Sequence, residues 1–310
     1  MQTLPPRKSC AEQPATLAAL LGGYAPTPFM IRSRERLPDV STAVRAERLI
    51  LTTVDGMAVR AILTGPAGEW ANCPALLYCH AHGHRTAIGA SELMAGRPAL
   101  LPEPYAAALA RQGMVALCID MPCFGERAHQ METALAKNLL WRGRTLFGQM
   151  LSELGSAFEL LRALDGVDAS RVSVFGFSMG ATQAFWLAAL EPRIRAVAHA
   201  CCFADLAHLV ASGADDLHGI YMTVPGLINA IGTGAIAGLA APRRQLICIG
   251  ARDPLTPPDA VAHALAEVRA SYARAGAGSA LEVHVSAETG HVETPAMRAA
   301  VLQFLASVSA

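Results

Sequence analysis

Residues 171–190 read RVSVFGFSMGATQAFWLAAL, in which an apolar strand-like run passes into an apolar helix-like run. The pattern G-x-S-x-G spans the junction at 176–180, with Ser178 at its centre. A sharp strand-to-helix turn needs small residues beside the central one, and it lifts the serine hydroxyl above the sheet edge. The N-terminus of the helix then points at that hydroxyl. The stretch predicts a nucleophile elbow; the alternative is a glycine-rich turn that carries an ordinary serine.

Apolar runs of strand length recur along the chain, and segments with helical periodicity separate them. The runs lie at 74–80, 114–120, 195–202, 245–250 and 281–287. Such an alternation predicts an α/β fold, with a mostly parallel sheet of about eight strands and helices on both faces. Residues 47–54 and 57–65 flank an Asp-Gly turn and predict a β-hairpin, which gives the sheet an antiparallel start.

The domain organisation is expected to be simple. Residues 1–40 are rich in proline and are interpreted as an N-terminal arm with a short helical segment, and residues 41–310 as one domain. Residues 203–241 interrupt the rhythm of strands and helices and are predicted to form a lid insertion. Residues 219–241 carry no charge and are long enough for a membrane span. Their proline and five glycines favour a buried or lid-forming stretch instead.

The composition excludes several classes of protein. Hydrophobic residues make up 53% of the 310 residues and charged residues 16%, so the chain can bury a large core and is not disordered. The formal net charge is zero, which argues against nucleic-acid and membrane partners. Eight cysteines without a C-x-x-C pattern, and an N-terminus without a signal-like apolar stretch, predict reduced thiols in a cytoplasmic protein.

A reactive serine needs two further residues. An isolated hydroxyl is a poor nucleophile at neutral pH, so it requires a base and an acid that orients the base. Asp253 and His291 each follow one of the last two apolar runs, where the carboxyl ends of parallel strands meet. The order Ser178, Asp253, His291 is the one expected with this elbow. Asp205, which follows the preceding run, is an alternative acid.

Three histidines at alternate positions raise a competing possibility. His80, His82 and His84 follow an apolar run and, with Asp120, could hold a zinc ion for a metal-dependent hydrolase. Side chains at alternate positions share a face only while the strand stays extended, and Gly83 indicates a turn. We therefore expect no metal and interpret the segment as a loop whose backbone serves the chemistry.

Five other residues are given structural interpretations. Asp120 ends a strand-like run and Arg127 follows a glycine turn, which favours an ion pair or a turn contact between them. Cys123 has no base beside it in the sequence and is not expected to be catalytic. His263 falls within a helix and His284 within a strand, and both are interpreted as packing or surface residues.

The chain resembles the α/β-hydrolases, and among them the dienelactone hydrolase-like and acetyl-xylan-esterase-like esterases. The resemblance covers about residues 45–308 and rests mainly on DASRVSVFGFSMGATQAF (168–185), GARDPLTPP (250–258) and ETGHVETPAMRAAVLQFL (288–305). Two further stretches, LLYCHAHG (76–83) and IDMPCFGER (119–127), also contribute to the resemblance. Dienelactone hydrolases proper use a cysteine at the elbow, so Ser178 points to the serine esterases of the group.

The resemblance also implies an oxyanion hole. Residues 80–83 align with the family's H-G-x-G motif, which implies that the backbone N–H of His82 is one oxyanion donor. Ala81 stands where the family has glycine. The second donor is expected to be the N–H of Met179, directly after the nucleophile. His80, His84 and Phe177 are assigned to the substrate pocket.

Together these features predict a serine carboxylic-ester hydrolase with Ser178, His291 and Asp253 as its catalytic residues. The uncharged insertion predicts a small, largely neutral ester as the substrate. No cofactor is expected, and a homo-oligomer remains open. The alternatives are a peptidase or other acyl hydrolase of the same fold, the metal-dependent hydrolase on His80, His82 and His84, and a ligand-binding protein without turnover.

Overall fold

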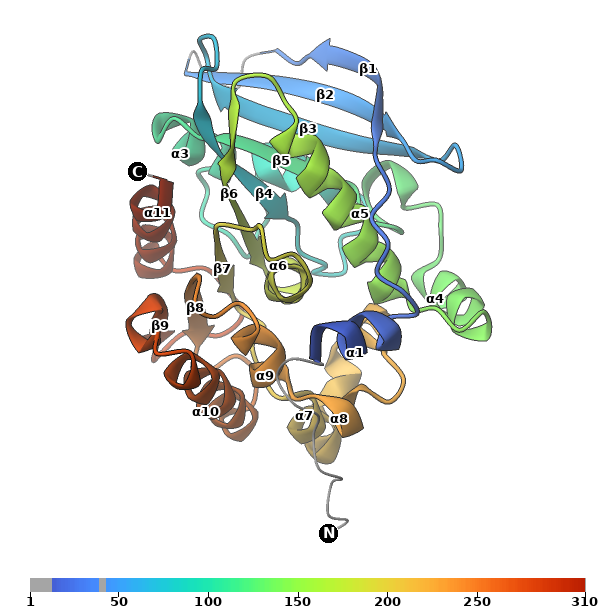
Figure 1. The fold of residues 1–310 in the computed structure, drawn as a ribbon, viewed down its shortest axis with the longest axis vertical. Helices are drawn as coiled ribbons and strands as arrows, with labels where there is room; N and C mark the ends of the chain where they lie inside the picture. Colours follow the sequence, from blue (N-terminus) through green and yellow to red (C-terminus); the bar gives the residue numbers. More distant parts are fainter. Residues whose placement is uncertain (1–12, 39–42, 310) are drawn as a thin grey trace.

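Nine strands form a single sheet in a computed structural model that describes residues 13–38 and 43–309 (Figure 1). The strands are β1 Met30–Arg36, β2 Val44–Thr52, β3 Ala58–Pro66, β4 Cys73–Cys79, β5 Val115–Ile119, β6 Val167–Phe177, β7 Ala196–Ala200, β8 Arg244–Gly250 and β9 Leu281–Ser286. Their order is β1-β2-β3-β5-β4-β6-β7-β8-β9. The first three strands and the β3–β5 pair are antiparallel, and all the other pairs are parallel. The predicted sheet with its antiparallel hairpin is confirmed.

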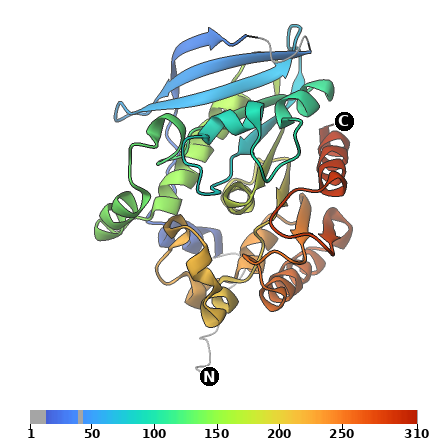
Figure 2. The ribbon, with the colours of Figure 1, turned by 180° about the vertical axis from the view of Figure 1, so that it is seen from behind.

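Helices cover both faces of this sheet. The longer ones are α1 Gln13–Leu20, α3 Tyr105–Arg111, α4 Glu132–Trp141, α5 Leu146–Arg162, α6 Met179–Leu190, α10 Pro258–Arg274 and α11 Pro295–Ser309. Core residues of α1, α5, α6 and α10 belong to one hydrophobic layer, and those of α3 and α11 to the other. Figure 2 shows the second face from behind, with α3 and its preceding loops in front.

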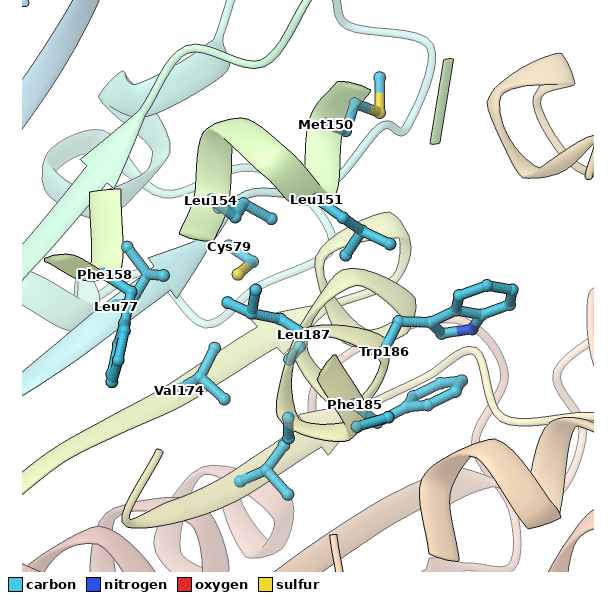
Figure 3. Close-up of a cluster of buried hydrophobic side chains, with 14 of the residues drawn as sticks. Leu77, Cys79, Met150, Leu151, Leu154, Phe158, Val174, Phe185, Trp186 and Leu187 are labelled. Carbon is cyan, nitrogen blue, oxygen red and sulfur yellow. The ribbon is translucent and has the colours of Figure 1, made fainter. Parts of the chain in front are cut away.

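Strand β4 shows why both faces are apolar. Leu77 and Cys79 contribute to one layer, whereas Leu76 and Tyr78 contribute to the other, because successive side chains of a strand point to opposite sides. Figure 3 shows Leu77 and Cys79 among side chains of α5 and α6. Helix α6 is buried along almost its whole length, which explains its mostly apolar sequence.

The segment at 203–241 lies between β7 and β8 and contains only short helices. They are α7 Leu206–Ser212, α8 Leu227–Ala230 and α9 Thr233–Gly238, with 3-10 turns at Ala214–Leu217 and Ile220–Met222. In Figure 1, α7 and α8 lie at the lower end of the molecule, whereas α9 lies between α6 and α10 and packs against both. Within the described residues, no helix has the length and apolar character needed to cross a membrane.

The described part of the predicted arm packs closely on the rest of the chain. Helix α1 lies where a helical segment was expected, and its Leu17 is fully buried in the core. The Thr145 hydroxyl donates a hydrogen bond to the carbonyl oxygen of Leu21 at 2.9 Å. Further along, β1 pairs with β2 and becomes the edge strand, one more than the sequence indicated. Residues 1–12 and 39–42 of the predicted arm and its junction lie outside the described residues.

Candidate active site

The turn between β6 and α6 holds Ser178 in a strained conformation. Its φ of 58° and ψ of −121° are unusual for a residue with a Cβ, and such strain costs about 1–3 kcal/mol. The Ser178 N–H donates to the Ala200 carbonyl at 2.9 Å, which ties the turn to β7. A Cβ at Gly176 would lie 2.1 Å from the Gly180 carbonyl oxygen, and one at Gly180 only 1.9 Å from that of Cys79. The turn therefore closes only with glycine at both positions.

Three side chains from separate strand ends form a hydrogen-bonded chain at this turn. His291 follows β9, and its Nε2 lies 2.8 Å from Ser178 Oγ. Its Nδ1 lies 2.6 Å from Oδ2 of Asp253, which follows β8. Since an ionised carboxylate only accepts hydrogen bonds, Nδ1 carries the proton and Nε2 presents its lone pair to the serine. The structure thus brings together the three residues that the sequence singled out.

The Asp253 carboxylate is held on both sides. Its side chain is fully buried, and its Oδ1 accepts a hydrogen bond from the Leu255 N–H at 2.9 Å. The imidazole of His291 also contacts the ring of Phe177, with 5.3 Å between the ring centroids. These contacts leave the imidazole little freedom to turn away from Ser178.

Two backbone N–H groups beside the elbow are available to a ligand. Among the described residues, neither the N–H of His82 nor that of Met179 donates a hydrogen bond. Met179 begins α6, where the first amides have no partner within the helix. The chain leaving β4 passes close by, since a Cβ at Gly180 would lie 3.0 Å from the His80 carbonyl oxygen. The two amides therefore suit the developing negative charge of an oxyanion.

A buried ion pair fixes the residue before His82. The Ala81 N–H donates to both carboxylate oxygens of Glu92, at 3.2 and 3.1 Å. Arg97 forms an ion pair with Glu92 and donates from Nη2 to the Ala81 carbonyl at 2.7 Å. The hydroxyl of Tyr78 donates to Glu92 at 2.9 Å. Sequence reasoning missed this network, and its only signal is a lone charge in the apolar stretch ASELMAG (90–96).

His82 also connects the loop to the insertion. Its Nδ1 accepts a hydrogen bond from the His84 N–H at 3.1 Å, so its Nε2 carries the proton and donates to Glu132 Oε2 at 2.7 Å. The other oxygen of Glu132 accepts from the Tyr221 N–H at 3.1 Å. The rings of Tyr221 and His82 are stacked, with 5.8 Å between their centroids. Glu132 thus joins the predicted oxyanion loop to the segment at 203–241, and the sequence gave no indication of it.

The structure corrects two of the residues assigned to the substrate pocket. His80 is fully buried; its Nδ1 donates to the Ala81 carbonyl at 3.0 Å, and its Nε2 accepts from the Met121 N–H at 3.2 Å. Burial lowers the pKa of His80 to about 4, so the imidazole is neutral and turned into the core. Phe177 is also a core residue, and it reaches the site only through His291. His84 is exposed and stays a candidate for substrate contact.

The structure does not favour the alternative of a metal site on the three histidines. Within the described residues, His80, His82 and His84 do not form a cluster of converging ligand atoms, because both ring nitrogens of His80 bind backbone groups. Asp120 is engaged as well, since it pairs with Arg60 at 2.8 Å and accepts the Ala90 N–H at 2.7 Å.

The other residues with structural interpretations fit into the framework. Arg127 donates to the Asp120 carbonyl at 3.2 Å, as a turn contact, but forms its ion pair with Glu153. Burial raises the pKa of Cys123 to about 11, which keeps the thiol protonated near neutral pH. Asp205 does not contact His291; it caps α7 and accepts from His208.

Two cavities adjoin the insertion. The larger, about 470 Å³, lies within the insertion itself, between α7 and α8, and is lined by residues such as Val210, His218 and Met222. The smaller, about 20 Å³, lies under the insertion and is lined by Thr182 and Cys202 among others. Thr182 is one helical turn from Ser178, so the smaller cavity adjoins the elbow.

Comparison with known proteins yields both sequence and fold relatives. Residues 103–211 match the model of the dienelactone hydrolase family. The YtaP protein of Bacillus subtilis strain 168, named as a hydrolase, is 34% identical over 233 residues, which are 75% of this chain and 78% of that protein.

Solved structures show the same fold at low identity. Acetyl xylan esterase 1 from Thermoanaerobacterium sp. JW/SL YS485 has a TM-score of 0.67 and 17% identity, and covers 99% of this chain and 96% of its own. The acetyl xylan esterase from Paenibacillus sp. R4 has a TM-score of 0.68 and 18% identity with the same coverage.

Proposed function

The chain belongs to the dienelactone hydrolase family and is a hydrolase, and on this premise we propose that it is a serine carboxylesterase acting on small, largely neutral esters. One observation carries the proposal: the hydrogen-bonded chain from Asp253 through His291 to Ser178 on a strained turn. In this arrangement the base is oriented by the acid and the nucleophile by the backbone.

The proposed reaction has two steps. Ser178 Oγ attacks the ester carbonyl carbon while His291 Nε2 accepts its proton, and Asp253 stabilises the resulting imidazolium. The N–H groups of His82 and Met179 hold the oxyanion. His291 then gives the proton to the departing alcohol, which leaves an acyl-enzyme. Water, activated by the same imidazole, attacks the acyl group and restores Ser178.

The small cavity supports a short acyl group. Its volume of about 20 Å³ exceeds the roughly 10–15 Å³ that one water molecule requires by only a little. Thr182 and Cys202, which line it, lie beside the elbow, and no aspartate, glutamate, lysine or arginine lines it. A methyl-sized acyl substituent therefore fits better than a long chain.

The segment at 203–241 is proposed to act as the lid of this site. Its Tyr221 stacks on His82 and is bound through Glu132, so the segment contacts the predicted oxyanion loop directly.

A cytoplasmic location is also proposed, because the seven described cysteines are free thiols.

A series of activated esters with acyl chains of increasing length tests the proposal. Wild type should turn over the acetyl ester with the highest kcat/KM, and Ser178→Ala should lose turnover by about 10⁶-fold in kcat, as for other serine nucleophiles. Ser173→Ala is the matched control, because Ser173 lies on β6, which leads to Ser178, and its buried hydroxyl has no hydrogen-bond partner among the described residues.

The outcomes are distinct. Turnover by Ser178→Ala at the wild-type rate would refute the serine mechanism. A preference for long acyl chains would refute the small substrate but leave the mechanism standing. Peptide substrates in the same series test the peptidase alternative.

A further inference from the structure

We propose that Asp205, His208 and His263 form a binding site for a divalent transition metal, with zinc as the best-suited ion. The three residues come from two elements: Asp205 and His208 from the start of α7, and His263 from α10. One ligand atom from each residue lies within 4.8 Å of the others. The site is separate from Ser178, and it does not depend on the proposed esterase function.

Asp205 supplies the strongest argument. Its side chain is only 1% exposed, and its Oδ1 accepts two hydrogen bonds from His208, from the backbone N–H at 3.2 Å and from Nδ1 at 2.7 Å. Its Oδ2 is buried and has no hydrogen-bond partner within the described part of the chain. A buried carboxylate oxygen without a partner is unfavourable, and a bound cation would remove that penalty.

The two imidazoles are placed to complete the set. The rings of His208 and His263 lie 4.4 Å apart between centroids, although they belong to different helices. Their side chains are 43% and 41% exposed, so a hydrated ion can reach them from solvent. Around a tetrahedral zinc ion, neighbouring ligand atoms are about 3.3 Å apart. Half-exposed imidazoles can close the remaining gap by rotating about their side-chain bonds.

The ligand chemistry selects the class of metal. Two imidazole nitrogens and one carboxylate oxygen are typical zinc ligands, whereas calcium and magnesium favour sites made of oxygen alone. Glu267 lies nearby, with its Oε1 3.8 Å from His263 Nε2, and adds negative potential.

The position of the site predicts a structural consequence. The Asp205 N–H already donates to the Ala260 carbonyl at 2.9 Å, so α7 and α10 are joined at their first turns. Helix α7 opens the segment at 203–241, and α10 directly follows the loop that carries Asp253. A metal bound here would fasten the insertion to the element behind the catalytic acid.

Zinc binding by the full chain, produced without a polyhistidine tag and stripped with a chelator, tests the proposal. Titration calorimetry with zinc chloride and metal analysis after dialysis should give one zinc per chain, with a rise in the thermal unfolding midpoint. His263→Gln should weaken zinc binding by at least about tenfold and remove the rise. His129→Gln, at an exposed histidine outside the cluster, should bind as wild type does.

A second variant separates loss of the ligand from loss of the fold. Asp205→Asn keeps a good cap for α7 but removes the charge, so it should fold and still bind zinc at least about tenfold more weakly. No zinc bound to wild type at tens of micromolar metal would overturn the proposal. Equal zinc binding by wild type and His263→Gln, both folded by circular dichroism, would overturn it as well.

Discussion

Two clusters of aspartate and histidine lie beyond the ends of neighbouring strands, and they differ in how the carboxylate is used. Asp253, after β8, has a partner on each oxygen: the Leu255 N–H on one and His291 on the other. Asp205, after β7, accepts two hydrogen bonds from His208 on one oxygen and none from the described residues on the other. A fully partnered carboxylate is fixed and can orient a base, whereas a half-partnered one retains capacity for a ligand.

The largest expected effect is the difference in kcat between variants of these two aspartates. Asp253→Asn should lower kcat for an activated acetyl ester by about 10³–10⁴-fold, because His291 would lose the acceptor that fixes its tautomer. Asp205→Asn should cost less than about tenfold, since Asp205 does not contact His291. Steady-state kinetics of both variants makes the comparison, and a larger loss in Asp205→Asn would reverse the assignment.

The next effect concerns Glu132, which positions His82. Glu132→Ala should lower kcat by about 10–100-fold with little change in KM, because an oxyanion donor that is displaced stabilises the transition state less. Glu132→Gln keeps one acceptor and should recover part of the rate.

The control is Glu103→Ala, which removes an exposed carboxylate whose ion pair is with Arg111. A change in KM alone for Glu132→Ala would show that Glu132 serves substrate affinity rather than the oxyanion loop.

A smaller effect is expected on the pH dependence of folding stability, to which the buried histidines contribute and the exposed ones serve as controls. Burial lowers the pKa of His80 to about 4 and that of His199 to about 3. Both are neutral in the folded chain but titrate near 6.5 when it unfolds, so the unfolded chain binds more protons below that pH. Stability should therefore fall as the pH drops from about 6.5 to 4, by about 1.4 kcal/mol per pH unit for each histidine.

Urea unfolding across this pH range measures the effect. His199→Gln keeps a polar partner for Gln245 and should remove about half of that slope. The exposed His129 serves as the control, since His129→Gln should leave the slope unchanged. A slope that His199→Gln does not alter would show that other groups govern the acid sensitivity.

The smallest effect is expected from a chelator. Treatment with EDTA should leave ester turnover almost unchanged, because neither Ser178 nor His291 belongs to the proposed metal site, while a serine-directed phosphonate should abolish turnover. Activity assays before and after each treatment provide the test. Loss of activity with EDTA combined with full activity after the phosphonate would favour a metal-dependent mechanism and contradict the serine assignment.

The sequence predicted those parts of the molecule that depend on local pattern. The elbow around Ser178 requires two glycines, and both are visible in the G-x-S-x-G pattern. The strand ends before Asp253 and His291 are predicted by the apolar runs that precede them. The sheet was predicted for the same reason, except that β1 falls in a polar, exposed stretch without strand-like alternation.

Contacts between distant residues could not be predicted in this way. Glu92 and Glu132 act on the loop after β4 from 11 and 50 positions away, and no motif surrounds either of them. The misassignment of His80 has a related cause, because alternation does not reveal which face of the strand end points into the core. The sequence likewise gives no indication that Asp205 and His263 are neighbours, because only the fold brings them together.

Gly180 has a consequence for how this site can change. A Cβ at this position would lie 1.9 Å from the carbonyl oxygen of Cys79 and 3.0 Å from that of His80, so the absence of a side chain lets the nucleophile turn and the loop that carries His82 lie close together. Even one added methyl group would force the nucleophile turn and the loop that carries His82 away from each other. The distance between the nucleophile and the oxyanion loop therefore depends on a residue that takes no part in the chemistry.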